Sequence, residues 1–317
     1  MATVITYSPA VTLVPTYECF NACSYCNFRV APGTDTWLSL EQAQERLRAI
    51  RRHHPQVTEV LILSGEVHPH SPRRAQWVEH LYQLAKLARD LGFWPHTNAG
   101  PLSEGEMRRL QTVNVSMGLM LEQLRPDLPV HHHAPSKDPT LRLAQLDQAG
   151  RLGIPFTTGL LLGIGETAAD WEAGLQAIAA VHRRWGHIQE VILQPYRQGS
   201  QQPTALADFP LAQLPAVVAL ARRLLPADIT IQVPPNLVDQ PEMLLACLAA
   251  GARDLGGIGP RDEVNPDYPY PALTRLTQLL ATHGYELQPR LPIYPKWCDS
   301  RHIWPRSSQS PEFGVRY

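Results

Sequence analysis

Short apolar segments alternate with amphipathic helical segments along most of the chain, and this alternation limits the fold more than any other feature. We expect strands at Val11–Tyr17, Glu59–Leu63, Phe93–Thr97, Asn114–Leu119, Pro155–Leu162, Glu190–Pro195, Ile229–Val233 and Asp254–Gly257. We expect helices at Ser39–Arg52, Pro72–Leu91, Ser103–Leu110, Pro139–Leu152, Thr167–Arg184, Leu211–Leu224, Gln240–Ala250 and Tyr270–Thr282. Eight such units predict an α/β fold, a (β/α)8 barrel of the TIM type. A six-stranded partial barrel with a C-terminal extension is the alternative.

The chain is assigned to one domain, residues 1–317, because no linker or internal repeat is visible and single barrels of this length are common. Residues 296–317 are expected to form an irregular C-terminal tail. The balance of 28 basic and 29 acidic residues argues against a surface for nucleic acid or anionic membranes. No apolar run approaches the roughly 20 residues of a membrane span, and no signal peptide is visible.

The five cysteines are an odd number without a secretion signal, so they do not predict a disulfide framework. We therefore expect the reducing cytoplasm, where grouped thiolates bind metals. Cys19, Cys23 and Cys26 have the spacing C-x3-C-x2-C. Three thiolates can bind three irons of a cubane 4Fe–4S cluster and leave the fourth iron open, whereas a cluster used only for electron transfer takes four cysteines. An open iron can chelate S-adenosylmethionine and pass an electron to its sulfonium, which generates a 5′-deoxyadenosyl radical.

A zinc site is the alternative, with a fourth ligand from His53 or from the run 131–133. Zinc loops usually carry two C-x2-C pairs, and this sequence has only one. Cys247 and Cys298 lie in a helix and in the tail, and we interpret both as structural thiols.

Unusual residues follow several of the expected strands, where a parallel barrel carries its chemistry. The cysteines follow the first strand, residues 64–66 the second, residues 96–98 the third, Glu122 the fourth and residues 163–166 the fifth, while Gln194 closes the sixth. Most of these residues are therefore expected to point toward one mouth of the barrel.

The cysteine motif, its place after a first strand and the following Gly-Glu resemble the radical-SAM superfamily. Within it, the chain closely resembles the ring-closing radical-SAM subunit of 7,8-didemethyl-8-hydroxy-5-deazariboflavin synthase. The stretches that carry this resemblance are TLVPTYECFNACSYCNFR, LILSGE, PHTNAG, SMGLMLE, PFTTGLLLGIGET and GHIQEVILQ, which span residues 12–194. The stretches GARDLGGIGP and VNPD in the last third also resemble the family.

The resemblance implies a set of cofactor contacts. Ser64 to Glu66 match a Gly-Gly-Glu element whose backbone binds the methionine ammonium, and Ser64 departs from it without removing a backbone contact. Glu122 and Arg142 are expected to bind the methionine zwitterion; a surface salt bridge is the alternative. The full set is Tyr25, Ser64, Gly65, Glu66, Asn98, Ser116, Glu122, Arg142, Gly163 and Glu166.

A second set of polar residues is expected to contact the substrate, because a uracil with a ribityl chain needs many neutral hydrogen-bonding groups. His131 and Lys137 also match the V-H-x-x-x-P-x-K loop of the family; a solvated histidine loop is the alternative. The set is His96, Thr97, His131, Lys137, Thr157, Thr158, Gln189 and Gln194. Some of these residues could instead cap helices or fill the barrel ends.

The resemblance implies an ammonia-releasing lyase with one 4Fe–4S cluster and S-adenosylmethionine. Its substrate would be the adduct of the hydroxybenzyl group of tyrosine with 5-amino-6-(ribitylamino)uracil. A separate sister radical-SAM subunit would make this adduct and associate transiently, and a flavodoxin or ferredoxin would deliver the electron. The alternatives are that sister subunit itself and a non-catalytic zinc or iron–sulfur protein. A sulfur-inserting enzyme is disfavoured because only two cysteines remain for a second cluster.

Overall fold

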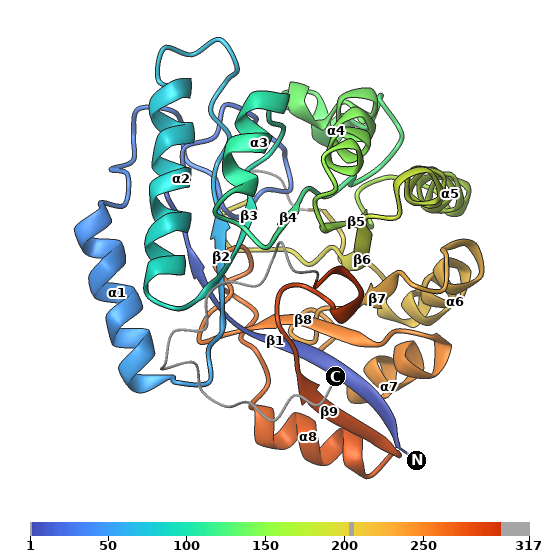
Figure 1. Ribbon diagram of the computed structural model, residues 1–317. Helices are drawn as coiled ribbons and strands as arrows, with labels where there is room; N and C mark the ends of the chain where they lie inside the picture. The colour runs from blue at the N-terminus through green and yellow to red at the C-terminus, as the bar shows by residue number, and fades with distance from the viewer. Residues whose placement is uncertain (1, 203–205, 299–317) are drawn as a thin grey trace.

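The barrel consists of eight parallel strands that form a closed ring, with eight helices around the outside (Figure 1). The computed structural model describes residues 2–202 and 206–298. In these residues the strand order is β2-β3-β4-β5-β6-β7-β8-β1-β9, and a further pairing of β1 with β2 closes the ring. The complete barrel predicted from the sequence is confirmed, and the six-stranded alternative is wrong. None of the described helices is long and apolar enough to cross a membrane.

Most elements begin and end within a few residues of the predicted bounds. The strands of the ring are β1 (Thr3–Leu13), β2 (Glu59–Leu63), β3 (Trp94–Asn98), β4 (Ser116–Gly118), β5 (Phe156–Leu162), β6 (Ile188–Pro195), β7 (Thr230–Gln232) and β8 (Asp254–Ile258). The helices are α1 (Leu40–His53), α2 (Arg74–Asp90), α3 (Glu104–Gln111), α4 (Pro139–Arg151), α5 (Ala168–Trp185), α6 (Leu214–Leu224), α7 (Pro241–Ala250) and α8 (Leu273–Ala281).

Local sequence explains where several helices start. The hydroxyls of Ser39 and Ser103 each accept a hydrogen bond from the backbone amide three residues on, and the side chains of Gln42 and Glu106 accept one from the backbone amide of the serine. These capping boxes satisfy amide groups that the first turn leaves unpaired. The helices then pack apolar faces on the strands, and residues such as Trp77, Leu81 and Leu84 of α2 are fully buried there.

Strand β1 differs from the prediction, which placed it at Val11–Tyr17. It starts at Thr3 and pairs with three other strands. Thr3–Tyr7 pair with β9 (Tyr285–Pro289), Thr6–Pro9 with β8, and Ala10–Leu13 with β2. Strand β9 is absent from the prediction. It lies outside the ring beside the first half of β1 (Figure 1), and its side chains alternate between partly buried and exposed.

The segment after β9 turns back across the barrel (dark red in Figure 1), at the end where the strands begin. The Pro292 carbonyl accepts hydrogen bonds from Ser116 Oγ at 2.7 Å and Gln189 Nε2 at 3.0 Å. The side chain of Arg290 enters the barrel from this side, where it is only 9% exposed. Of the tail expected at 296–317, residues 299–317 lie outside the described residues, and Lys296 belongs to a 3₁₀ turn at Pro295–Trp297.

Candidate active site

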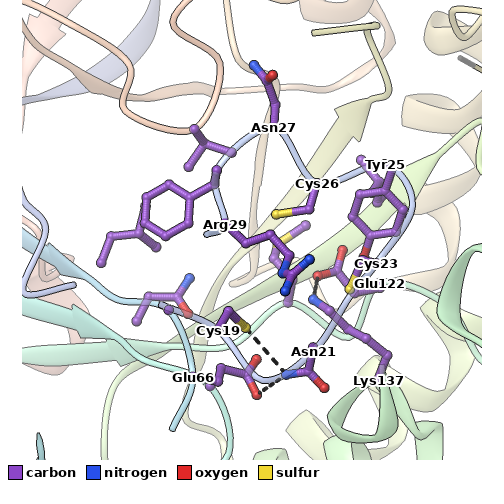
Figure 2. Close-up of a pocket in the computed structure, with 18 of the residues that line it drawn as sticks. Cys19, Asn21, Cys23, Tyr25, Cys26, Asn27, Arg29, Glu66, Glu122 and Lys137 are labelled. Carbon is purple, nitrogen blue, oxygen red and sulfur yellow. Dashed lines mark hydrogen bonds and ion pairs between the residues drawn. The ribbon is translucent and has the colours of Figure 1, made fainter. Parts of the chain in front are cut away.

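A cavity of about 230 Å³ lies at the end of the barrel where the strands finish (Figure 2). The long loop between β1 and α1 forms one side of it, and the ends of β2 to β6 form the other. Its lining includes Cys19, Asn21, Cys23, Tyr25, Cys26, Asn27, Arg29, Ser64, Gly65, Glu66, Asn98, Glu122, Lys137, Arg142 and Gln194. Nine of the candidate residues other than the cysteines line this cavity, namely Tyr25, Ser64, Gly65, Glu66, Asn98, Glu122, Lys137, Arg142 and Gln194.

Backbone hydrogen bonds hold the cysteine loop in place. The amide of Cys26 donates to the Cys23 carbonyl at 3.1 Å, which forms a tight turn between the two thiols. The loop is also tied to the histidine run, because Ala22 donates to the His133 carbonyl at 2.7 Å. The phenol of Tyr25 lies 3.1 Å from His131 Nε2. His131 thus supports the cysteine loop through its contact with Tyr25. Burial lowers the pKa of its imidazole to about 4.

The three cysteines are free thiols, and the cavity suits a group that would hold them as thiolates. Burial raises the pKa of Cys19, and burial raises the pKa of Cys23 to about 11. Metal binding favours the deprotonated thiol and so opposes this effect. In the described part of the chain no three His, Cys, Asp or Glu side chains converge on a point where one metal ion would fit.

Asn21 joins the cysteine loop to the end of β2. Its side-chain amide donates to Glu66 Oε2 at 2.9 Å and lies 3.6 Å from Cys19 Sγ, as the dashed lines in Figure 2 show. At Gly65 an added Cβ would lie 2.1 Å from the Glu18 carbonyl oxygen, so the backbones pack too closely for a side chain. Asn21 was not among the residues predicted from the sequence, although its place within the cysteine motif could have indicated it.

Glu122 is held in a backbone conformation that few residues adopt. Its φ of 64° makes it the one described non-glycine residue with positive φ, and such local strain often occurs at functional sites. Burial would raise the pKa of Glu122, but the charges of Lys137 and Arg142 outweigh burial and hold that pKa below its usual value. Lys137 Nζ lies 2.6 Å from Glu122 Oε1.

Arg142 is almost completely buried behind this pair. It is 1% exposed, donates to the Ser136 and Met120 carbonyls, and lies 3.3 Å from Glu66 Oε1. The surface salt bridge considered for Arg142 is therefore wrong, because the guanidinium lies in the interior and links two carboxylates, Glu66 and Glu122.

Arg29 is a further residue that sequence reasoning missed. Its side chain extends into the cavity that the cysteines line (Figure 2), and its buried Nε has no hydrogen-bond partner among the described residues. A buried guanidinium nitrogen without a partner is costly unless an acceptor reaches it. An anionic group in the cavity would satisfy it, so the charges here suit a ligand with a carboxylate.

A second cavity continues the first one down the inside of the barrel. Asn98, Met120 and Gln194 line both cavities. The lower cavity is also lined by Thr12, Glu59, His96, Thr157, Glu190, Gln232, Asn236, Asp262, Tyr270 and Arg290. We call this lower cavity the lumen. Most of its polar groups are neutral side chains or carboxyl groups, so it can accept a ligand with several hydroxyl and amide groups.

The lumen ends on one buried arginine and two carboxyl groups. Arg290 Nη2 lies 2.7 Å from Glu190 Oε1, and Arg290 Nε lies 2.6 Å from Asp254 Oδ2. Burial would raise the pKa of Asp254, but Arg290 outweighs burial and lowers it. Burial raises the pKa of Glu190 despite Arg290, and Asp254 adds to the rise. One guanidinium cannot neutralise two carboxylates, and the raised pKa of Glu190 favours its protonated form.

Several predicted residues lie outside both cavities. Thr97 Oγ1 donates to Asn114, and Thr158 Oγ1 accepts from the Leu121 amide. The carboxylate of Glu166 accepts from the amides of Gly163 and Ile164 and from the Trp171 indole, so it caps its own loop. The remaining residues of this kind are Gly163, Ser116, His131 and Gln189; the last three contact the cavity lining or the Pro292 segment.

Residues 13–178 match the Radical SAM superfamily model. A 7,8-didemethyl-8-hydroxy-5-deazariboflavin synthase from Thermosynechococcus vestitus is 64% identical over 298 residues, which cover 93% of this chain and 94% of the relative. The chain belongs to this synthase family. A second 7,8-didemethyl-8-hydroxy-5-deazariboflavin synthase, from Synechococcus elongatus, is 65% identical over 300 residues, 93% of this chain and 88% of the relative.

Solved structures agree on the fold of this deazariboflavin synthase family member. The FeFe-hydrogenase maturase HydG from Carboxydothermus hydrogenoformans superposes with a TM-score of 0.73 at 19% identity, over 95% of this chain and 69% of its own. Methylornithine synthase superposes with a TM-score of 0.66 at 16% identity, over 90% of this chain and 84% of its own. The chain is thus a radical SAM enzyme by family, and membership implies a 4Fe–4S cluster and S-adenosylmethionine as cofactors.

Proposed function

We propose that this chain is the lyase that closes the central ring of 7,8-didemethyl-8-hydroxy-5-deazariboflavin and releases ammonia. Its substrate would be 5-amino-5-(4-hydroxybenzyl)-6-(D-ribitylimino)-5,6-dihydrouracil. The observation that carries the proposal is the continuity of the two cavities, because the cysteine cavity leads directly into a polar lumen past Asn98 and Gln194. The names of the relatives support the identity of the product.

The upper cavity would hold the cofactors. A 4Fe–4S cluster on Cys19, Cys23 and Cys26, with S-adenosylmethionine, would supply the one-electron chemistry that starts the reaction. The chain itself provides charges of both signs: Glu122 suits the ammonium group of the methionine part, and Arg29 suits its carboxylate. Tyr25 lies within the cysteine loop beside these groups, where its ring is a candidate to pack on the adenine.

The lumen would bind the substrate below the cofactors. The ribityl and pyrimidine groups offer hydroxyl and N–H donors together with carbonyl acceptors. His96, Thr157 and Gln194 line the lumen with matching acceptors and donors, and Lys137 lies in the cysteine cavity beside Glu122. Met120, which lines both cavities, places an apolar side chain where the two ligands would meet.

Cys19, Cys23, Cys26 and Cys247 are free thiols, which suits the reducing cytoplasm. We propose that a sister radical-SAM subunit supplies the adduct in transient association, and that a flavodoxin or ferredoxin supplies the electron. The chain would act as one barrel domain, because both cavities lie within a single ring of strands.

The sister activity, which joins tyrosine to 5-amino-6-(ribitylamino)uracil, is the second candidate, and a half-reaction separates the two. The chain, reconstituted anaerobically with iron and sulfide and supplied with S-adenosylmethionine and dithionite, receives either the pre-formed adduct or its two precursors. We expect fluorescent deazaflavin, 5′-deoxyadenosine and ammonia from the adduct, and no deazaflavin from the precursors.

The control for this experiment is the Cys23→Ala variant, which should form none of the three products. Conversion of tyrosine to adduct, without further reaction, would identify the chain as the sister subunit. Deazaflavin from tyrosine and the uracil without any partner would contradict the division between two subunits.

A further inference from the structure

We propose that His96 presents the Nε2 lone pair of a neutral imidazole to a hydrogen-bond donor of the ligand in the lumen, and that Ser116 and the Pro292 carbonyl position it. The ligand class is a polyol-bearing heterocycle with O–H and N–H groups. This assignment rests on the proposed function, since it takes the lumen to be the substrate site.

The hydrogen bonds around Ser116 determine which ring nitrogen of His96 carries the proton. Ser116 Oγ lies 2.7 Å from the Pro292 carbonyl oxygen, and this oxygen can only accept. The hydroxyl proton must therefore lie between these two oxygens. Ser116 Oγ also lies 2.7 Å from His96 Nδ1, so it accepts from that nitrogen. His96 is thus protonated on Nδ1, and Nε2 has a free lone pair.

The surroundings keep the imidazole neutral. Burial, and then the positive charge of Arg290, lowers the pKa of His96 to about 3. A group with such a low pKa remains neutral near pH 7 and is a weak base. His96 is therefore suited to accept a hydrogen bond and not to remove a proton from the ligand.

The ring is held against the wall of the lumen with Nε2 at its surface. His96 lines the lumen, and no described residue donates a hydrogen bond to Nε2. A Cβ added at Gly118 would lie 2.9 Å from Nε2, so glycine at this position leaves the space that the ring occupies. The neighbouring strand and the Pro292 segment together leave the ring one orientation, with its unpaired nitrogen toward the cavity.

The tautomer can be measured directly by nitrogen-15 NMR on the full-length, anaerobically reconstituted chain labelled at histidine, with the His96→Phe variant to assign the signals. We expect the free protein to show a protonated Nδ1 and an unprotonated Nε2 at His96. Addition of 7,8-didemethyl-8-hydroxy-5-deazariboflavin should shift the Nε2 signal, because a donor then reaches it. A protonated Nε2 in the free protein would overturn the inference, whatever the reaction of the enzyme.

Binding of the same deazaflavin supplies a second measurement. We expect roughly tenfold weaker binding of the deazaflavin to His96→Phe, because a donor of the ligand is left unpaired. Ser116→Ala should lose less affinity, because His96 keeps its ring but its proton is no longer fixed on Nδ1. Ser116→Thr keeps the hydroxyl and should restore both affinity and nitrogen signals. His187→Phe is the matched control, because it removes another buried imidazole that lies outside both cavities.

The outcomes separate this inference from the proposed function. Wild-type affinity in His96→Phe, or no binding of deazaflavin by the wild type, overturns the acceptor role. Normal turnover of the adduct with unchanged affinity in both His96→Phe and Ser116→Ala contradicts the inference alone. An inactive wild type with the expected nitrogen signals and the expected losses of affinity supports the inference and contradicts the proposed function.

Discussion

Lys137 Nζ lies 2.6 Å from Glu122 Oε1, whereas the nearest nitrogen of Arg142 lies 3.9 Å from the same oxygen. Of the described cations, Lys137 is thus the closest partner of Glu122, although the sequence predicted it as a substrate contact. Arg142 extends the pair to Glu66. Two carboxylates and two cations therefore form one connected network beside the cysteine loop, and a zwitterionic ligand can bind there by exchanging partners with it.

Substitution of Glu122 tests whether this network binds S-adenosylmethionine. Glu122→Gln removes one charge-assisted contact, and we expect roughly ten- to hundredfold weaker binding of S-adenosylmethionine with full iron content. The measurement is equilibrium binding to the reconstituted protein under anaerobic conditions. Glu79→Gln, on an exposed part of α2, is the control and should bind as the wild type does. Equal affinity in both variants would remove Glu122 from the cofactor site.

Substitution of Arg142 has a different expected result, because this side chain is buried. Arg142→Met leaves the Ser136 and Met120 carbonyls without this donor. It also removes a positive charge that offsets the negative charges of Glu66 and Glu122. We expect the free energy of unfolding to fall by about 3–5 kcal/mol, measured by urea denaturation. Arg108→Met, whose ion pair on α3 is exposed, should change it by less than about 1 kcal/mol. A similar small loss in Arg142→Met would contradict the structural role.

The cysteines give a prediction about iron. Cys19→Ala, Cys23→Ala and Cys26→Ala should each lose the cluster, because two thiolates cannot bind it as three do. Cys247→Ala should keep full iron and sulfide content, since Cys247 is buried in α7 among apolar residues and does not line the cavity of the other three. Cys298→Ala should do the same. Iron and sulfide analysis after reconstitution, together with visible absorbance, measures the cluster content of each variant. Retention of iron by Cys23→Ala would contradict the prediction.

Strands that consist of one short apolar run were the easiest elements to predict. Glu59–Leu63 is a short apolar run, and the structure has β2 at these residues. The first strand is harder, because Thr3–Tyr7 mix polar and apolar residues without a regular period, and Thr3 to Ile5 pair only with β9. Strand β9 itself has no apolar run, since every second side chain faces solvent. Its existence depends on a pairing between the two ends of the chain.

The site residues show the same division between local and distant causes. His96 and Asn98 line the cavities while Thr97 between them points away, as the alternation of side chains along a strand requires. This rule, applied to the sequence, could have separated Thr97 from its neighbours. Arg290 had no local signal, because it meets Glu190 from 100 residues farther along the chain.

The buried carboxyl of Glu190 predicts a dependence of stability on pH. Burial, with Asp254 adding to it, raises the pKa of Glu190 to about 8. The folded state therefore holds a proton that the unfolded state releases near pH 4.5, so this contribution to stability is complete below pH 4.5 and is lost as pH rises toward 8. Glu190→Gln cannot lose a proton, and its stability relative to the wild type should rise across this range.

The expected rise is on the order of 2–4 kcal/mol, measured from urea denaturation at a series of pH values. Only the difference between the two proteins is interpreted, because histidines and other groups titrate in both. Glu286→Gln, on the exposed side of β9, is the control and should follow the wild type. Parallel curves for Glu190→Gln and the wild type would show that Glu190 is ionised throughout.

The closure of the barrel by the segment after β9 has a consequence for the order of biosynthesis. Translation produces all eight strands of the ring before it produces Arg290 and Pro292. A nascent chain stopped after β8 would be a tube open at both ends, with Asp254 and Glu190 exposed to water inside it. The segment with Arg290 and Pro292 then supplies the cation that pairs with both carboxyl groups. It also closes this end of the barrel, so that ligands reach the interior from the end where the strands finish.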